Sequence, residues 1–234
     1  MKNLIIFGMF IMALVFVQFA QAQSVDDIVG KYIDALGGKE KLMSLQSVKM
    51  QANMSIQGTD VSITTTKLHM KGMRQDISVM GSDNYQIVTP EKGTVFMPIQ
   101  GMSSPTAMTE DQLKAGQSQL DVQSSLLNYK EKGTTVELLG TEKIDGADNY
   151  KLKITYKNGV ASTYFIGTKD YRLNKSVGKR NVNGEEMEIE TTFSNYKQNA
   201  DGYWFAYTSV SMQGELNFEK IETNVKVDES IFKQ

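Results

Sequence analysis

The sequence predicts a mainly β (α+β) fold: a curled antiparallel sheet that forms an incomplete barrel of about 11–12 strands, plugged by short helices. After one amphipathic helix near the start, apolar residues recur at every second position, which is typical of half-buried strands. Glycine-containing turns separate these segments, and only three prolines occur in 234 residues. A sheet of this length cannot stay flat, because the right-handed twist of its strands curls it.

The first 22 residues have the pattern of a secretory signal peptide. Lys2 gives the charged start, Leu4 to Val17 form an apolar run, and small residues precede a cleavage site after Ala22. The run is short for a bilayer, which needs about 20 apolar residues. We therefore expect residues 1–22 to be removed, leaving residues 23–234 as a single β domain in the periplasm.

The chain contains no cysteine. This composition excludes disulfides, thiolate metal sites, a cysteine nucleophile and a lipid-anchored cysteine at the cleavage point. Loss of Lys2 with the signal changes the formal charge from −2 to −3, and acidic and basic residues are mixed along the chain. Because no basic patch is present to neutralise phosphates, nucleic acid is not an expected partner.

Residues 24–36 form the clearest predicted helix. Ser24 and Asp27 make a capping box, and Gly37 and Gly38 end the helix. A short helical turn over 39–45 is expected to lead into the sheet. One apolar stripe on the first helix is formed by Val25, Ile28, Val29, Tyr32, Ile33 and Leu36.

From about Gln46 the apolar period changes from 3.6 to 2, which predicts strands. Asn158-Gly159 and Asn183-Gly184 indicate hairpins with type I′ turns. Residues 99–132 interrupt the pattern with a loop around Pro105 and a helix capped by Thr109 and Gln112. After the strand at 46–56, further strands are expected near 61–70, 73–80, 84–89, 94–98, 134–141, 150–157, 160–166, 172–179, 185–196, 203–213 and 215–226.

No set of residues forms a recognisable catalytic or metal site. His69 is the only histidine, so we interpret it as a structural or surface residue. Glu186, Glu188 and Glu190 alternate with apolar residues, which places them on a solvated outer face. Because hydrolase, phosphate-binding and dinucleotide-binding motifs are missing, we predict no catalytic residue, no metal and no cofactor.

Methionine is abundant: 11 of the 14 methionines lie after residue 22. Flexible thioethers suit a cavity that moulds around acyl chains, although they also fill ordinary cores. Both interpretations stay open on composition alone. The residues predicted to line an apolar, ligand-binding cavity are Met50, Met54, Ile56, Ile63, Met80, Met97, Met187 and Ile189.

Several short motifs follow one another in an order shared with a known family. They are Asp27-Ile-Val-Gly-Lys-Tyr-Ile-Asp-Ala-Leu-Gly-Gly, Lys71-Gly-Met-Arg-Gln-Asp-Ile, Val136-Glu-Leu-Leu-Gly with Tyr150-Lys-Leu-Lys, Tyr164-Phe-Ile with Asp170-Tyr-Arg-Leu, Phe193-Ser-Asn-Tyr-Lys, and Asn224-Val-Lys-Val-Asp-Glu-Ser-Ile-Phe. In this order the chain resembles the LolA/LolB outer-membrane lipoprotein-sorting superfamily, in the periplasmic form common among Bacteroidetes.

The resemblance implies an incomplete barrel whose apolar cavity takes the acyl chains of a lipoprotein passing from the inner to the outer membrane. It implies no cofactor and no chemistry. It also implies that Arg74 helps hold a helical lid, to which Leu113 and Leu120 of the interrupting helical region would belong.

The resulting hypothesis is a soluble, non-catalytic, monomeric carrier for lipoprotein acyl chains or another lipid. Its partners would be lipidated protein or lipid, transient envelope proteins and, only briefly, the membrane. The alternative is an envelope protein-interaction or structural module with a filled barrel and no lipid. Such a module would dock through a sheet edge or an exposed patch of Tyr203, Trp204 and Phe205.

Overall fold

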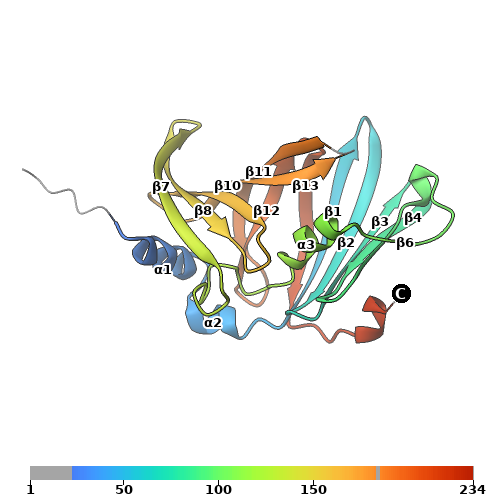
Figure 1. The fold of residues 1–234 in the computed structure, drawn as a ribbon, viewed down its shortest axis with the longest axis horizontal. Coiled ribbons are helices and arrows are strands. Elements are labelled where there is room, and N and C mark those ends of the chain that lie inside the picture. Colours follow the sequence, from blue (N-terminus) through green and yellow to red (C-terminus); the bar gives the residue numbers. More distant parts are fainter. Residues whose placement is uncertain (1–22, 183–184, 234) are drawn as a thin grey trace, which may run out of the picture.

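The computed structural model describes residues 23–182 and 185–233. Thirteen strands form one antiparallel sheet that is not closed, in the order β6-β5-β4-β3-β2-β1-β13-β12-β11-β10-β9-β8-β7 (Figure 1). Their bounds are β1 Ser47–Ile56, β2 Thr59–Leu68, β3 Gly72–Val79, β4 Ser82–Val88, β5 Gly93–Phe96, β6 Thr106–Ala107, β7 Thr135–Ile144, β8 Ala147–Thr155, β9 Ala161–Gly167, β10 Leu173–Val182, β11 Glu185–Gln198, β12 Trp204–Ser211 and β13 Gly214–Thr223.

The predicted fold class is confirmed, with a slightly larger sheet than expected. The additional strand is β6, two residues long, which lies in the region predicted as a loop around Pro105. It pairs with β5 through Thr94 and Val95. The predicted signal peptide and the Asn183-Gly184 turn lie outside the described residues.

Within residues 23–182 and 185–233, three short α-helices and two 3-10 helices accompany the sheet. They are α1 Val25–Ala35, α2 Lys39–Met43, α3 Glu110–Gln117, η1 Pro98–Gln100 and η2 Glu229–Phe232. Both predicted capping boxes are present, at Ser24 with Asp27 and at Thr109 with Gln112. None of the helices in the described ranges is long and apolar enough to cross a membrane.

The hairpin at Asn158-Gly159 differs from the predicted type I′ turn. Gly159 has a φ of 85°, but Asn158 is not among the described residues with positive φ. The N–H of Gly159 donates to the carbonyl of Tyr156 at 2.9 Å, and the N–H of Tyr156 donates to Val160 at 2.8 Å. This is the three-residue loop in which a type I turn precedes one left-handed glycine, so only Gly159 needs the unusual conformation.

The sheet is continuous because β1 pairs with β13, which lies at the other end of the chain. The register runs from Val48 opposite Thr223 to Asn53 opposite Asn217, with an irregularity between Gln51 and Ala52. We call this pairing the seam. It joins β1–β6 to β7–β13 and leaves β6 and β7 as the two edges of the sheet.

Because β6 and β7 lie at opposite edges, the chain between them must cross the sheet. It does so through α3 and the residues that follow it. We call residues 118–134 the crossover segment. Both α3 and the crossover segment lie on the concave side of the curled sheet (Figure 1). The buried apolar residues form three core clusters, one around Ile28 and Leu152, one around Leu45 and Ile221, and one around Met73 and Val88. The crossover segment supplies an apolar side chain to each of them, namely Leu126, Val122 and Leu120. It is therefore part of the core and not a surface loop.

The strand registers assign side chains to the two faces. Met50 lies opposite Thr65, which lies opposite Gln75, which lies opposite Gln86, so this row shares one face. The same face carries Val88, against which α3 packs, and is therefore the concave face.

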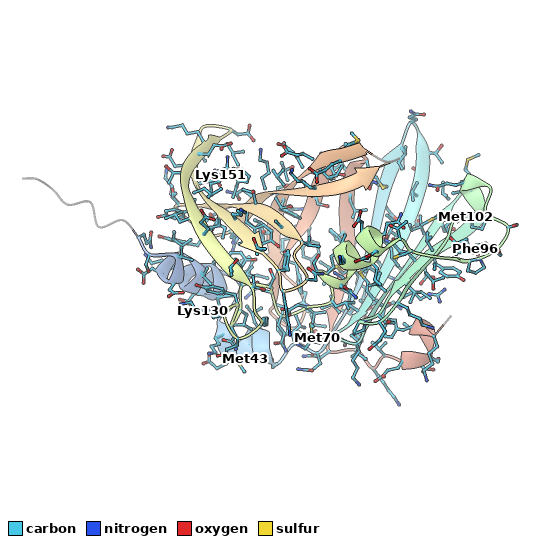
Figure 2. All side chains as sticks on the ribbon, in the orientation of Figure 1. Met43, Met70, Phe96, Met102, Lys130 and Lys151 are labelled. Carbon is cyan, nitrogen blue, oxygen red and sulfur yellow. The ribbon has the colours of Figure 1, made fainter. Side chains whose placement is uncertain are left out.

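The convex face is polar. Glu186 and Glu190 lie on it and form ion pairs with Lys179 and Lys175 at 2.6 and 3.2 Å, which confirms the predicted outer acidic stripe. The Phe165 ring, also on this face, is covered by the ammonium groups of Lys151 and Lys175 at 5.4 and 4.8 Å. Figure 2 shows Lys151 at the opposite end of the sheet from Phe96 and Met102.

The ladder between β12 and β13 is short. Only Thr208 to Ser211 of β12 pair with β13, although both strands continue further. Beyond this ladder the buried Asn199 bridges the gap: its amide donates to the Ile221 carbonyl at 3.2 Å and to Thr223 at 3.0 Å. Its carbonyl oxygen accepts from the N–H of Tyr203 at 2.9 Å.

Replacement of Asn199 by Ala is expected to lower the free energy of unfolding by about 2–4 kcal/mol, because it removes three buried hydrogen bonds and leaves their partners unsatisfied. Urea denaturation measures the change. Asn217→Ala, which removes an exposed amide from the paired part of β13, is the control and should cost under about 1 kcal/mol. Equal losses for the two variants would contradict the bridging role of Asn199.

Candidate functional site

The concave face carries an open strip of apolar side chains near the β1–β2 and β12–β13 turns. Its members share the face by register and lie outside the three core clusters. They come from β1, β2, β3, β11 and β13, on both sides of the seam. We call this set the apolar strip: Met54, Ile63, Ile77, Ile189, Phe193 and Leu216.

Six of the eight residues predicted to line a cavity share the concave face by strand register: Met50, Met54, Ile56, Ile63, Met187 and Ile189. Met50 packs on the cluster around Leu45 and Tyr203 and is part of the core. Ile56 and Met187 lie toward the rim and are 43% and 37% exposed.

Two predicted residues lie elsewhere. Met80 occupies the β3–β4 turn with a φ of 51° and is 79% exposed. Met97 follows β5 at the start of η1, where its N–H donates to the sulfur of Met102 at 3.3 Å. Both are turn residues that period-2 counting placed on a strand face, so the strand ends were set too far along the chain.

Helix α3 lies over the concave face and contacts both halves of the sheet, namely β4 and β5 on one side and β10 on the other. A Cβ on Gly116 would lie 2.7 Å from a methyl of Val88, so the close approach of α3 to β4 depends on this glycine. On the other side, the Asn158 amide donates to the Lys114 carbonyl at 2.9 Å. Leu113 and the buried Leu120 pack on the cluster of Met73 and Val88, so these two predicted lid residues do lie on the concave side.

Arg74, the third predicted lid residue, lies on the convex face, opposite Ile87 and Thr66. Its guanidinium donates to Asp76 at 2.8 Å and to the Ile231 carbonyl at 3.4 Å, and it lies 4.8 Å from the Tyr85 ring centre. These contacts hold η2, whose Phe232 packs on Gly72. The expectation that Arg74 holds the helical lid does not follow from this placement, because α3 lies on the other face.

Sequence reasoning missed a polar row on the concave face. The Gln86 amide donates to Gln75 at 2.7 Å, and the Gln75 amide donates to the Thr65 hydroxyl at 3.2 Å. Lys67, the next inward residue on β2, donates to the Gln119 carbonyl at 3.2 Å. The alternation Val61, Ile63, Thr65, Lys67 contained this signal, because it puts a lysine on an otherwise apolar face.

Charged groups surround Lys67 where the crossover segment begins. Asp121 accepts from Lys132 at 2.5 Å and lies 3.5 Å from Nδ1 of His69, a buried nitrogen with no hydrogen-bond partner among the described residues. Burial lowers the pKa of Lys67 to about 8, although the charge of Asp121 opposes this shift. Burial also lowers the pKa of His69, with the charge of Lys132 acting in the same direction and that of Asp121 against it.

The patch of Tyr203, Trp204 and Phe205, considered as an exposed docking surface, is not exposed. Tyr203 is buried in the cluster with Leu45 and Ile221, and Phe205 packs on the same cluster. Trp204 is half-buried, with the Arg172 guanidinium 4.1 Å from its ring centre. The described side chains also include no group of three or more His, Cys, Asp or Glu residues placed to hold a metal ion.

Two depressions are lined mainly by residues outside the apolar strip, although Ile77 contributes to the second. One, of about 330 Å³, lies between α1 and residues 126–131, with Leu126 and Leu127 in its lining. The other, of about 370 Å³, surrounds Arg74, Asp76 and Tyr85.

Comparison with solved structures identifies the architecture. A LolA superfamily protein from Nitrosomonas europaea matches with a TM-score of 0.57 and 14% identity, over 89% of this chain and 97% of that one. A DUF1329 family protein from Desulfovibrio piger matches with a TM-score of 0.56 and 14% identity, over 89% and 96%. The chain has a LolA-like fold. No sequence model of a protein family and no curated protein matches it.

Gly116→Ala is expected to displace α3 of this LolA-like fold, because the added methyl would overlap Val88. An Ala normally stabilises a helix interior by about 0.5–1 kcal/mol relative to Gly. The matched control is Gly30→Ala in α1, where a Cβ meets nothing within 4 Å and this gain should appear. Hydrogen exchange should accelerate in residues 110–117 only for Gly116→Ala, and unchanged exchange there would exclude a packed lid.

Lys67→Met is expected to stabilise the protein at pH 7 by about 2 kcal/mol, because the folded state then no longer buries an ammonium. The pKa of Lys67 is about 8 in the folded protein, whereas its ordinary value, which applies in the unfolded chain, is 10.5. The unfolded chain therefore binds more protons between these values, so the stability of the wild type should rise from pH 8 to 10.5. This rise should be smaller in Lys67→Met and unchanged in Lys153→Met, an exposed control. Urea denaturation at pH 7, 9 and 10 tests both statements.

Proposed function

We propose that the protein is a non-catalytic carrier in the bacterial periplasm that binds acyl chains, of lipoproteins or of another lipid, along the apolar strip. Residues 1–22 would act as the export signal, and residues 23–234 would form one unanchored, monomeric domain. The observation that carries the proposal is the asymmetry of the sheet: the convex face has charged side chains over aromatic rings such as Phe165, whereas the concave face has half-buried Met, Ile and Phe side chains outside the core clusters.

The placement of α3 supports this function. The helix packs on the sheet through the side chain of Leu113 and the backbone of Gly116, and its other residues are polar except Ala115. An element with so few buried apolar contacts opens at low cost compared with global unfolding. Displacement of α3 would let a chain enter between the two halves of the sheet, and each methylene transferred from water would contribute about 0.8 kcal/mol.

The similar fold of the LolA superfamily protein from Nitrosomonas europaea supports the same proposal. An alternative function, as an envelope protein-interaction module, is favoured by one observation: at the β7–β9 end, α1 and the crossover segment fill the concave face with buried residues such as Ile28, Leu127 and Ile154. Whether a lipid binds to the apolar strip of the concave face distinguishes the two functions.

Ile63→Asp is expected to weaken the binding of a palmitoylated lipopeptide by at least about tenfold, because it places a carboxylate on the apolar strip. Thr64→Asp is the matched control, since Thr64 is the next residue of β2 and faces the convex side. Binding is measured by native mass spectrometry of residues 23–234, with circular dichroism to confirm folding. If the wild type takes up no lipid or lipopeptide, and carries none from its own periplasm, the interaction-module function replaces the carrier.

A further inference from the structure

The row of inward residues on β2 changes from apolar to cationic along the strand. Val61 and Ile63 are followed by Thr65 and then Lys67, all on the concave face. The four residue steps from Ile63 to Lys67 span about 13 Å along a strand. A long ligand lying along β2 would therefore meet an apolar surface at one end and an ammonium at the other.

Lys67 has a neutral partner in the described structure. Its Nζ donates to the Gln119 carbonyl, and it forms no ion pair with a carboxylate of the described residues. The nearby acid, Asp121, is already bound by Lys132 at 2.5 Å. Lys132 thus takes the carboxylate nearest to Lys67. A half-buried ammonium whose partner is a neutral carbonyl gains a charge-assisted hydrogen bond when an anion arrives.

The polar row next to Lys67 is a separate observation that points to the same kind of ligand. Amide donors run in one direction, from Gln86 to Gln75 and from Gln75 to the oxygen of Thr65. Because Thr65 accepts this bond, its own hydroxyl hydrogen is available to a further acceptor. Lys67 and Thr65 therefore offer two donors side by side at the polar end of the apolar strip.

We propose that the ligand held on the apolar strip is an acyl lipid with an anionic head group, a carboxylate or a phosphate, bound by the ammonium of Lys67 and the hydroxyl of Thr65. This inference rests on the proposed carrier function and adds the chemistry of the head group. The acyl chain would run from Lys67 past Ile63 toward Met54. The anion would replace the Gln119 carbonyl, so that entry of the head group would be coupled to movement at the start of the crossover segment.

The test compares three ligands with the same acyl chain: palmitate, 1-palmitoyl lysophosphatidic acid and neutral 1-monopalmitoylglycerol. Affinities for residues 23–234 are measured by displacement of a fluorescent fatty acid and by calorimetry. The wild type should bind at least one anionic ligand about tenfold or more tightly than the neutral one, and the comparison of palmitate with the lysophosphatidic acid distinguishes carboxylate from phosphate. Lys67→Met should bring the preference to within about twofold, whereas Lys67→Arg should retain it.

Lys153→Met, an exposed lysine on the convex face, is the matched control and should keep the full preference. Equal binding of all three ligands by the wild type would overturn the head-group assignment and leave the carrier function in place. Retention of the preference in Lys67→Met would overturn the assignment to Lys67. If none of the three ligands binds, the head-group assignment is overturned, and the binding of the palmitoylated lipopeptide then decides whether the carrier function stands.

Discussion

The pairing of β1 with β13 is the interaction on which the rest of the structure depends. Without this seam, β1 and β13 would each present an open edge, and two separate meanders would replace one sheet. Only a continuous sheet of this length has enough accumulated twist to curl and to form a concave face. The apolar strip exists for the same reason, because Met54 and Leu216 come from the two strands that the seam joins.

A second consequence of this topology is that the chain must cross the concave face to pass from β6 to β7. The crossing carries main-chain polar groups and charged side chains into a region that is otherwise apolar. Some of these groups are satisfied locally, as where the N–H of Met70 donates to the Leu120 carbonyl at 3.0 Å and the Gln123 amide donates to Met43 and Leu45. Lys67 and Asp121 lie among these polar groups. The polar end of the candidate site is therefore located where the crossover segment meets the sheet.

Local signals predicted most of the fold. The capping boxes at Ser24 and Thr109 and the period-2 pattern after Gln46 depend only on neighbouring residues, and the structure has these elements close to where the sequence placed them. The two-residue strand β6 has no local signal of its own, because it is defined only by its pairing with β5.

The candidate site was less predictable, because distant parts of the chain determine which face of the sheet is covered and how deeply each side chain is buried. Arg74 is one residue away from the inward Met73, and only the placement of α3 and η2 shows which side of β3 each element covers. Tyr203 looked exposed by composition, but it packs against Leu45, which lies in a segment far away in the sequence. Lys67 could have been placed on the inner face by alternation, whereas its shortage of counter-charge depends on Lys132 and Asp121 from the crossover segment.

The short ladder between β12 and β13 gives the sheet a line of mechanical weakness. Four residue pairs hold these strands together, and beyond them the links to β13 and the residue after it are side-chain hydrogen bonds from the β11–β12 turn, made by Asn199, Asp201 and Tyr203. A sheet bends most easily where its hydrogen-bond ladder is interrupted, so a change in the width of the half-barrel would concentrate at this line and leave the seam intact. Strands β7–β12 would then move relative to β13 and β1–β6. Because α3 contacts β4 and β5 in one of these parts and β10 in the other, its packing would change when they separate.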